Sequence, residues 1–179
     1  MANAREAVDY IRFHLGMELE ETKMHKLLYY IQGWSLAWTG KPLFEQDIQA
    51  WALGPVVPSM RHYQAPALHP QQYDLSAEQI DIIESVVETY GGMSANKLVS
   101  LTHTESPWLD AWGDRGHDDK GNEPISHVAM RREFTRQAIQ GKGPIHRKPE
   151  YKEIPDDKLE RILDEACLNW DRTLRLLAQ

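Results

Sequence analysis

One stretch constrains the fold more than any other, because residues 22–40 repeat apolar side chains at helical spacing. The stripe consists of Met24, Leu27, Leu28, Ile31 and Trp38. Apolar residues at this spacing predict a helix that buries one face. We expect Thr22 to cap its N-terminus, and Gly40 and Pro42 to end it. Glycine inside a helix costs about 1 kcal/mol relative to alanine, so another element should pack closely at Gly33.

The same periodicity, together with capping residues, predicts the other helices. We expect them at residues 4–15, 76–90, 94–101, 106–112 and 126–138, with a short helix running from Pro58 towards Tyr63. Ser76 and Gln79 match the capping box, and the other N-cap candidates are Ser94, Ser106 and Ser126. Residues 41–58 form short apolar clusters between Gly and Pro, which predicts turns with at most a minor short β element near residues 42–53. Residues 113–123 are a predicted polar loop, and the fold class is mainly α.

A stretch rich in glycine and proline separates this helical region from the C-terminal residues. Gly141, Gly143 and Pro144 should end the last helix of the domain. Residues 156–179 predict an amphipathic helix, whose polar face pairs Asp157 with Arg161 at helical spacing. We therefore expect a single helical domain at residues 1–140, a linker at residues 141–155, and a C-terminal amphipathic helix at residues 156–179.

Charge and cysteine content exclude several classes of protein. With 20 Lys and Arg against 27 Asp and Glu, the net charge is −7, which argues against a dedicated nucleic-acid binder and favours a basic partner. The single Cys excludes a disulfide framework and any multi-cysteine metal site. The uncharged run Leu27–Gly40 is shorter than a spanning helix requires, and the first residues do not form a secretory signal. We expect a cytoplasmic protein that does not act at a membrane.

No familiar catalytic signature is present. The sequence lacks the phosphate-binding loop, the nucleophile elbow, the HExxH zinc motif and the dinucleotide-binding glycine motif, so we expect no enzyme, no catalytic residue, no metal and no cofactor. The alternative is a metal-dependent hydrolase that uses His103, Glu105 and His117. These histidines do not lie at a helical ligand spacing, and a solvated polar loop explains them more simply.

Basic residues gather in one segment. Between Arg131 and Lys152 there are seven Lys and Arg against two Glu, a local charge of +5. Such a segment could contact promoter DNA, which makes a DNA-binding autoregulator a further alternative. Aromatic side chains, on which nucleic-acid bases could stack, are not interleaved with these basic residues. A solvated helix end and linker is therefore the preferred interpretation.

The segment 51–63 forms a stiff apolar corner. Gly54 precedes Pro55, and Pro55 and Pro58 bracket Val56 and Val57, which restricts the backbone strongly. Apolar side chains on such a rigid corner suit the binding of a partner protein. Packing of the corner onto the helix at residues 22–40 is the alternative, and spacing alone does not decide between them.

Several ordered motifs resemble the Panacea domain, the family of SocA-like and GepA-like phage-associated proteins. The resemblance spans residues 3–138 and rests on Lys26-Leu27-Leu28-Tyr29-Tyr30, Trp34, Leu36-Ala37, Gly40-Lys41-Pro42-Leu43-Phe44, Ile48, Ala50-Trp51, Gly54-Pro55-Val56-Val57-Pro58, Leu101-Thr102-His103 and Pro107-Trp108. Two positions depart from the family pattern: Leu53 stands where Tyr is common, and His25 where Gln is common. Leu53 can therefore alter the choice of partner.

The resemblance implies an antitoxin of a type II toxin–antitoxin system. Members of the family are mostly helical and neutralise toxins of unrelated chemistry by direct binding, and SocA-like members act as adaptors that hand the toxin to a AAA+ protease. The expected partners are thus a cognate toxin and a AAA+ protease, and self-association stays open. The residues expected to contact the toxin are Trp51, Leu53, Gly54, Pro55, Val56, Val57, Met60, Tyr63, His103, Trp108 and Trp170.

Overall fold

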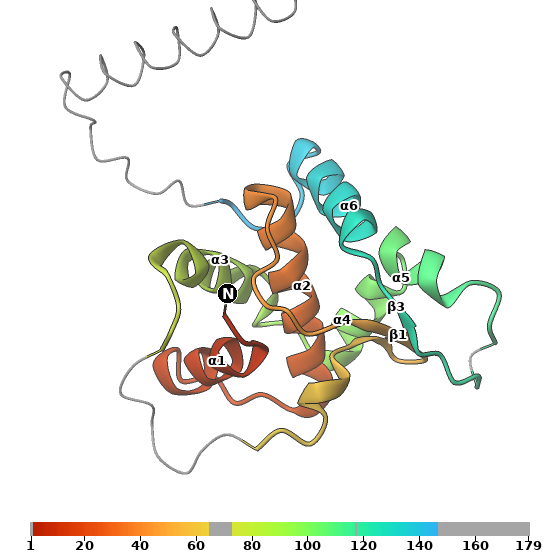
Figure 1. The fold of residues 1–179 in the computed structure, drawn as a ribbon, viewed down its shortest axis with the longest axis horizontal. Helices are drawn as coiled ribbons and strands as arrows, with labels where there is room; N and C mark the ends of the chain where they lie inside the picture. Colours follow the sequence, from red (N-terminus) through yellow and green to blue (C-terminus); the bar gives the residue numbers. More distant parts are fainter. Residues whose placement is uncertain (1, 65–72, 117, 147–179) are drawn as a thin grey trace, which may run out of the picture. The chain divides into compact units, whose positions relative to one another are not determined.

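The structure is a computed structural model that describes residues 2–64, 73–116 and 118–146 (Figure 1). The chain divides into two compact units, residues 1–147 and 148–179, and the second unit lies outside the described residues. Only residues 141–146 of the expected linker are described. The expected C-terminal helix, including Trp170, lies outside them as well.

Helices make up most of the first unit, so the prediction of a mainly α fold is confirmed. The helices are α1 (Ala4–Asp9), α2 (Glu21–Thr39), α3 (Ala77–Tyr90), α4 (Ala95–Thr102), α5 (Ser106–Trp112) and α6 (His127–Ile139). A π-helical turn, η1 (Tyr10–His14), continues α1, and a 3-10 turn, η2 (Pro58–Met60), begins at Pro58 as expected.

The capping residues agree with prediction at three helices and differ at two. Ser76, Ser94 and Ser126 each accept a backbone hydrogen bond from the first turn of the helix that follows. The expectation for Thr22 is wrong, because Glu20 takes the extended N-cap conformation and its carbonyl accepts from the Met24 N–H. Ser106 is not the cap of α5 either, since that position belongs to Glu105. The Ser106 hydroxyl instead donates to the Glu133 carboxylate at 3.1 Å.

A small antiparallel sheet crosses one end of the helices. Its strands are β1 (Gln49–Trp51), β2 (Gly54–Val56) and β3 (Glu123–Pro124), in the order β2-β1-β3. Trp51 pairs with Gly54 across the hairpin, and Ala50 pairs with Glu123. The β element is therefore larger than the expected one near residues 42–53. Strand β3 lies at the end of the predicted polar loop, where two exposed residues give no periodicity from which to predict it.

Helix α2 is the centre of the fold. In Figure 1 it runs between α1 and α3 on one side and α6 on the other. Every residue from Met24 to Leu36 is buried, so the helix is enclosed on all its faces rather than along the one predicted stripe. A helix in this position must satisfy each of its polar side chains internally.

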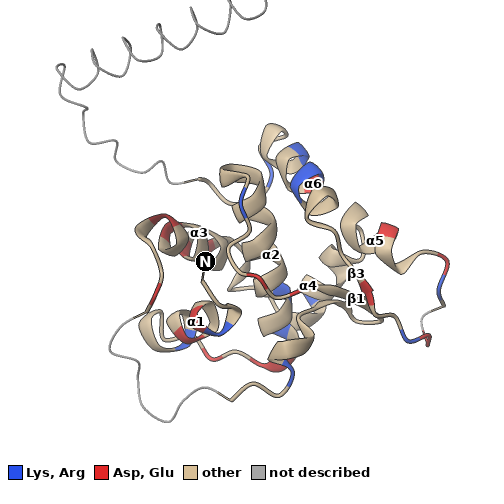
Figure 2. Cartoon of the chain, in the orientation of Figure 1, with Lys and Arg blue, Asp and Glu red and all other residues tan. Residues whose placement is uncertain are grey.

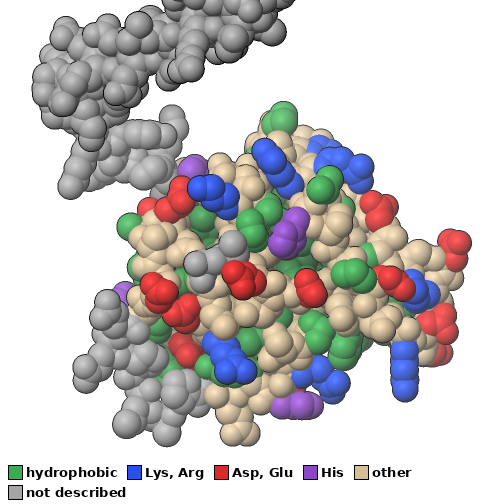
Figure 3. All heavy atoms as spheres, viewed as in Figure 1, with side chains coloured by type: hydrophobic (Ala, Val, Ile, Leu, Met, Phe, Trp, Pro, Cys, Tyr) green, Lys and Arg blue, Asp and Glu red, His purple; other side chains and the backbone are tan. Residues whose placement is uncertain are grey.

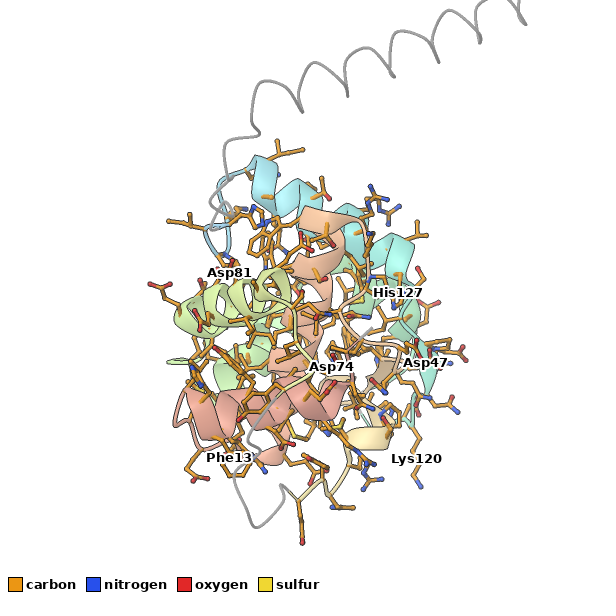
Figure 4. The ribbon with its side chains drawn as sticks, turned by 60° about the vertical axis from the view of Figure 1, so that its left-hand side comes forward. Phe13, Asp47, Asp74, Asp81, Lys120 and His127 are labelled. Carbon is orange, nitrogen blue, oxygen red and sulfur yellow. The ribbon has the colours of Figure 1, made fainter. Side chains whose placement is uncertain are left out.

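The buried polar side chains of α2 bind the non-helical segment that follows it. The Gln32 amide donates to the Phe44 carbonyl at 2.9 Å and accepts from the backbone N–H groups of Leu43 and Phe44. The Ser35 hydroxyl donates to the Lys41 carbonyl at 2.8 Å. His127, at the start of α6 (Figure 4), places its Nε2 3.2 Å from the Gln32 amide nitrogen. These side chains thus fix the path of residues 41–44 against α2.

The expectation for Gly33 is confirmed, and α6 is the element that approaches it. A Cβ at Gly33 would overlap the ring of Phe134. That ring is fully buried and packs edge-on against Tyr29, Tyr30 and Trp34. Glycine is therefore required where α2 and α6 make their closest approach.

Replacing Gly33 by alanine should destabilise the fold despite alanine's better helix propensity. The added methyl group would displace Phe134, and overpacking of this kind costs about 1–3 kcal/mol, more than the ~1 kcal/mol gained in propensity. We expect a lower free energy of unfolding in urea for Gly33→Ala. The matched control is Gly92→Ala, because a Cβ at Gly92 meets nothing within 4 Å. Equal stability of Gly33→Ala and the wild type would contradict the close α2–α6 packing.

Candidate functional site

The structure separates the corner at residues 51–63 into a buried part and an exposed part. Gly54, Pro55, Val56, Val57 and Met60 are all buried, with Val57 and Met60 at 0% and 1% exposure. These five residues pack inward, because β2 lies against α2 and α4. Leu53 in contrast is 56% exposed, and Trp51 and Tyr63 are half-buried.

The hairpin tip, Trp51-Ala52-Leu53, is held rigidly. Trp108 donates its indole N–H to the Trp51 carbonyl at 3.0 Å, and the Arg61 guanidinium lies over the Trp51 ring at 5.2 Å. The Trp51 indole N–H donates to the Gln49 side chain at 3.0 Å. Leu53 therefore projects from a tip whose backbone and neighbouring ring are both fixed. This arrangement favours docking of a preformed partner, since little side-chain order is lost on binding.

Two hollows flank the hairpin tip. The first, the tip pocket, has a volume of about 360 Å³ and lies between the first turns of α2, the hairpin and Arg61. The second has a volume of about 520 Å³ and is lined on its far side by residues 119–122, including Lys120 (labelled in Figure 4). Trp51, Ala52 and Arg61 line both hollows, so the tip forms a ridge between two depressions.

Three ionisable side chains of α2 line the tip pocket. Lys26 is 1% exposed, and its Nζ donates to the Pro55 carbonyl at 3.0 Å. His25 is 3% exposed, and its Nδ1 accepts from the Val57 N–H at 3.3 Å. Glu21 lies at the rim, where its carboxylate accepts from the His62 N–H at 3.2 Å. The corner is thus fastened to α2 by the side chains of Lys26 and His25.

Burial shifts the protonation of these two bases. Desolvation lowers the pKa of Lys26 from 10.5 to about 7, and lowers the pKa of His25 from 6.5 to about 4. The His25 imidazole is therefore neutral near pH 7, and because its Nδ1 accepts a hydrogen bond, its proton lies on Nε2. The Glu21 carboxylate is 3.8 Å from that nitrogen, and the backbone hydrogen bond from His62 lowers the pKa of Glu21.

The other residues expected to bind the toxin lie in different surroundings. Tyr63 donates its hydroxyl to the Asp9 carboxylate, at 2.9 and 3.1 Å from its two oxygens, and so ties η2 to α1. His103 stacks on Trp108 with ring centroids 4.1 Å apart, and Trp108 is itself 6% exposed. The structure thus places Trp51, Leu53 and Val56 around the tip pocket, whereas Tyr63 and His103 lie outside its lining.

The residues of the metal-site alternative do not converge. Within residues 2–64, 73–116 and 118–146, no group of three His, Cys, Asp or Glu is placed to hold a metal ion. His103 is stacked on Trp108, and His117 lies outside the described residues. Glu105 is buried and accepts a hydrogen bond from the Gln137 amide at 3.2 Å. Its surroundings are those of a buried protonatable group, since desolvation raises the pKa of Glu105 to about 7.

The basic segment is partly neutralised by neighbouring carboxylates. Figure 2 shows basic residues gathered on α6, with acidic residues on α1, α3 and the loops. On α6, Arg132 forms an ion pair with Asp110 at 3.3 Å, and Arg136 pairs with Glu133. Residues 147–152 of the segment lie outside the described part of the chain.

Large exposed apolar side chains are few among the described residues, and two of them, Val128 and Ile139, line one hollow on α6. Hydrophobic side chains on the face in Figure 3 are dispersed among charged and polar ones. Apart from Leu53, the exposed large hydrophobic residues are Leu109, Val128, Ile139 and Ile145. Leu53 is the one that stands beside a pocket with buried ionisable side chains, and such a pocket is the usual location of a binding site.

A comparison with protein families tests the resemblance to the Panacea domain. The family model described as "Antitoxin SocA-like, Panacea domain" matches residues 24–109. Residues 24–109 are therefore similar to the Panacea domain. The match includes most of α2, the hairpin, α3, α4 and the first half of α5, and therefore Lys26, His25 and the tip. Helix α6 lies outside the matched segment, although its Phe134 is part of the core around α2.

A curated protein is similar to part of this chain. The chain is 30% identical over 115 residues to Antitoxin SocA of Caulobacter vibrioides (strain NA1000 / CB15N), an alignment that covers 52% of this chain and 60% of that protein. The chain thus spans about three fifths of the length of this relative. No solved structure matches the chain. Among the described residues, none of the helices is both long and apolar enough to cross a bilayer.

The buried Glu105 should make stability fall as pH rises. Its pKa is about 7 in the folded protein against an ordinary value of 4.5, so the folded state favours the protonated carboxyl. By proton linkage, the protonated Glu105 contributes its full share of the free energy of unfolding below pH 4.5. That share, roughly 2–3 kcal/mol, is lost as the pH rises past 7. We expect Glu105→Gln to flatten the dependence of the free energy of unfolding on pH between 5 and 8. Glu45→Gln, at an exposed site, is the control, and an unchanged slope in Glu105→Gln would contradict the assignment.

Proposed function

We propose that this protein is the antitoxin of a type II toxin–antitoxin system, which neutralises a cognate toxin in the cytoplasm by binding it directly. The observation that carries this proposal is the Panacea match over residues 24–109, supported by the similarity to Antitoxin SocA. The family favours a binding role over catalysis. The hairpin tip supplies a rigid exposed apolar side chain beside a pocket, which is the usual arrangement of an interface hot spot.

We propose the hairpin tip as the surface that contacts the toxin. Leu53 is the exposed apolar residue of the tip, and Trp51 with Arg61 forms the fixed wall beside it. This surface is supported from within by buried residues: Gly54, Pro55, Val56, Val57 and Met60. Trp108 supports the tip directly through its hydrogen bond to the Trp51 carbonyl, and His103 stacks on Trp108. Tyr63 acts away from the tip pocket, by tying η2 to α1.

Co-expression with the product of the neighbouring reading frame tests the function. Rescue of growth with a stable co-purified complex supports neutralisation by sequestration. Rescue with disappearance of the partner, reversed when the AAA+ protease is inactivated, supports an adaptor that delivers the toxin to proteolysis. A neighbour that is harmless alone and does not bind would contradict the antitoxin assignment at this locus. Size-exclusion chromatography of the pure protein tests whether it self-associates.

Substitution of Leu53 should separate binding from folding. Leu53→Asp places a charge in the apolar centre of the proposed interface, so we expect at least tenfold weaker toxin binding, a loss of about 1.4 kcal/mol or more. Because Leu53 is 56% exposed, the Tm should change little. Val128→Asp is the matched control, since Val128 is 79% exposed on α6. Equal weakening by both substitutions, or by neither, would exclude the hairpin tip as the toxin-binding surface.

A further inference from the structure

The Lys26 amine is a buried base without an anionic partner. Its Nζ donates to the Pro55 carbonyl, and the Thr102 hydroxyl and Gly54 pack beside it. A Cβ at Gly54 would lie 2.7 Å from the Thr102 Oγ1 and 2.9 Å from the Lys26 Cε, so the enclosure is tight. Among the residues that the structure describes, no carboxylate forms an ion pair with Lys26, and burial alone lowers its pKa.

A buried ammonium with only neutral acceptors is costly, and a carboxylate brought close to it would relieve much of that cost. The tip pocket offers a route, because Lys26 belongs to its lining. His25 adds a second donor: its Nε2 is buried and carries the proton of the neutral ring, and it makes no hydrogen bond within the described residues, although the Glu21 carboxylate lies 3.8 Å away. The pocket also adjoins the N-terminus of the 19-residue helix α2, where Glu20 makes no side-chain cap. That end of the helix favours negative charge.

The remaining charges around the pocket do not fill this role. Glu21 is held at the rim by His62, through a backbone hydrogen bond of 3.2 Å and an ion-pair contact of 3.4 Å. Arg61 lies over the Trp51 ring. The groups that face Lys26 from β2 and α4, the Pro55 carbonyl and the Thr102 hydroxyl, are uncharged. The pocket therefore has more capacity for a negative group than its own residues use.

We propose that the tip pocket binds an acidic side chain of the partner protein, whose carboxylate pairs with Lys26 while an adjacent apolar side chain packs on Leu53. The identification of the partner as a toxin rests on the proposed function. The binding of a carboxylate in the pocket can be tested without that function. The volume of about 360 Å³ lies at the small end of ligand pockets, which suits one acidic side chain and its apolar neighbour. Binding takes up a proton near pH 7.5, because the bound carboxylate holds Lys26 in the charged form.

Two short peptides that differ only in the carboxylate test the proposal: acetyl-Leu-Glu-amide and acetyl-Leu-Gln-amide, titrated into the full chain. The pKa of Lys26 is read from the ¹³Cε chemical shift. We expect the Glu peptide to raise that pKa by about one unit and to bind about tenfold more tightly than the Gln peptide. Equal binding of the two peptides, or an unchanged Lys26 pKa, would overturn the proposal. Preference for acetyl-Leu-Lys-amide would do the same and would point to Glu21, and preference for acetyl-leucine would assign the pocket to a chain end instead.

Variants locate the effect. Lys26→Met should abolish the preference for the Glu peptide, whereas Lys120→Met, at the neighbouring hollow, should keep it. Because Lys26→Met removes a contact that fastens the hairpin and can unfold the chain, the wild-type pKa titration decides the question without it. Discrimination between the peptides without toxin binding would leave the pocket assignment standing and remove the antitoxin function. Toxin binding without discrimination would do the reverse.

Discussion

The enclosure of α2 is the constraint on which the rest of the structure depends. A helix buried on every face from Met24 to Leu36 keeps its polar side chains from water, and those of Lys26, Gln32 and Ser35 bond instead to the segment at residues 41–55. Each such bond contributes only about 1 kcal/mol net, but leaving its buried partner unpaired costs 1–3 kcal/mol. The hairpin is irregular and short, and little within it would keep it in place. Its position is set by α2, which is why a nonhelical corner can present a rigid surface.

The same constraint links the core to the tip pocket. Lys26 and His25 lie at the end of α2 where the helix emerges beside the hairpin, and they bind the carbonyl of Pro55 and the N–H of Val57. The burial that strengthens the hydrogen bonds of these two side chains to the hairpin also lowers their pKa values. The structural role of Lys26 and its capacity to pair with an added carboxylate therefore have one physical origin, the exclusion of water from the base of the hairpin.

Sequence patterns predicted the helices well because apolar spacing and caps are local signals. The capping box at Ser76 and the close approach at Gly33 both follow from neighbouring residues, and the structure bears them out. Contacts between residues far apart in the sequence could not be predicted in this way. Gln32 and Ser35 look like polar interruptions of an apolar run. Only the fold shows that their side chains form hydrogen bonds with the backbone of residues 41–44. Burial of Val57 and Met60 depends likewise on α2 and α4 lying behind the corner, so spacing left two alternatives where packing leaves one.

Buried and exposed positions alternate between neighbouring residues of one hairpin. Lys26, Gly54 and Pro55 belong to the motifs that carry the family resemblance, and all three are buried in the joint between α2 and β2. Leu53, one residue before Gly54, is exposed. Substitution at Leu53 changes the surface without disturbing the hydrogen bond from Lys26 or the close approach at Gly54. A hairpin built in this way can exchange its exposed side chain while keeping the buried contacts that hold it in place.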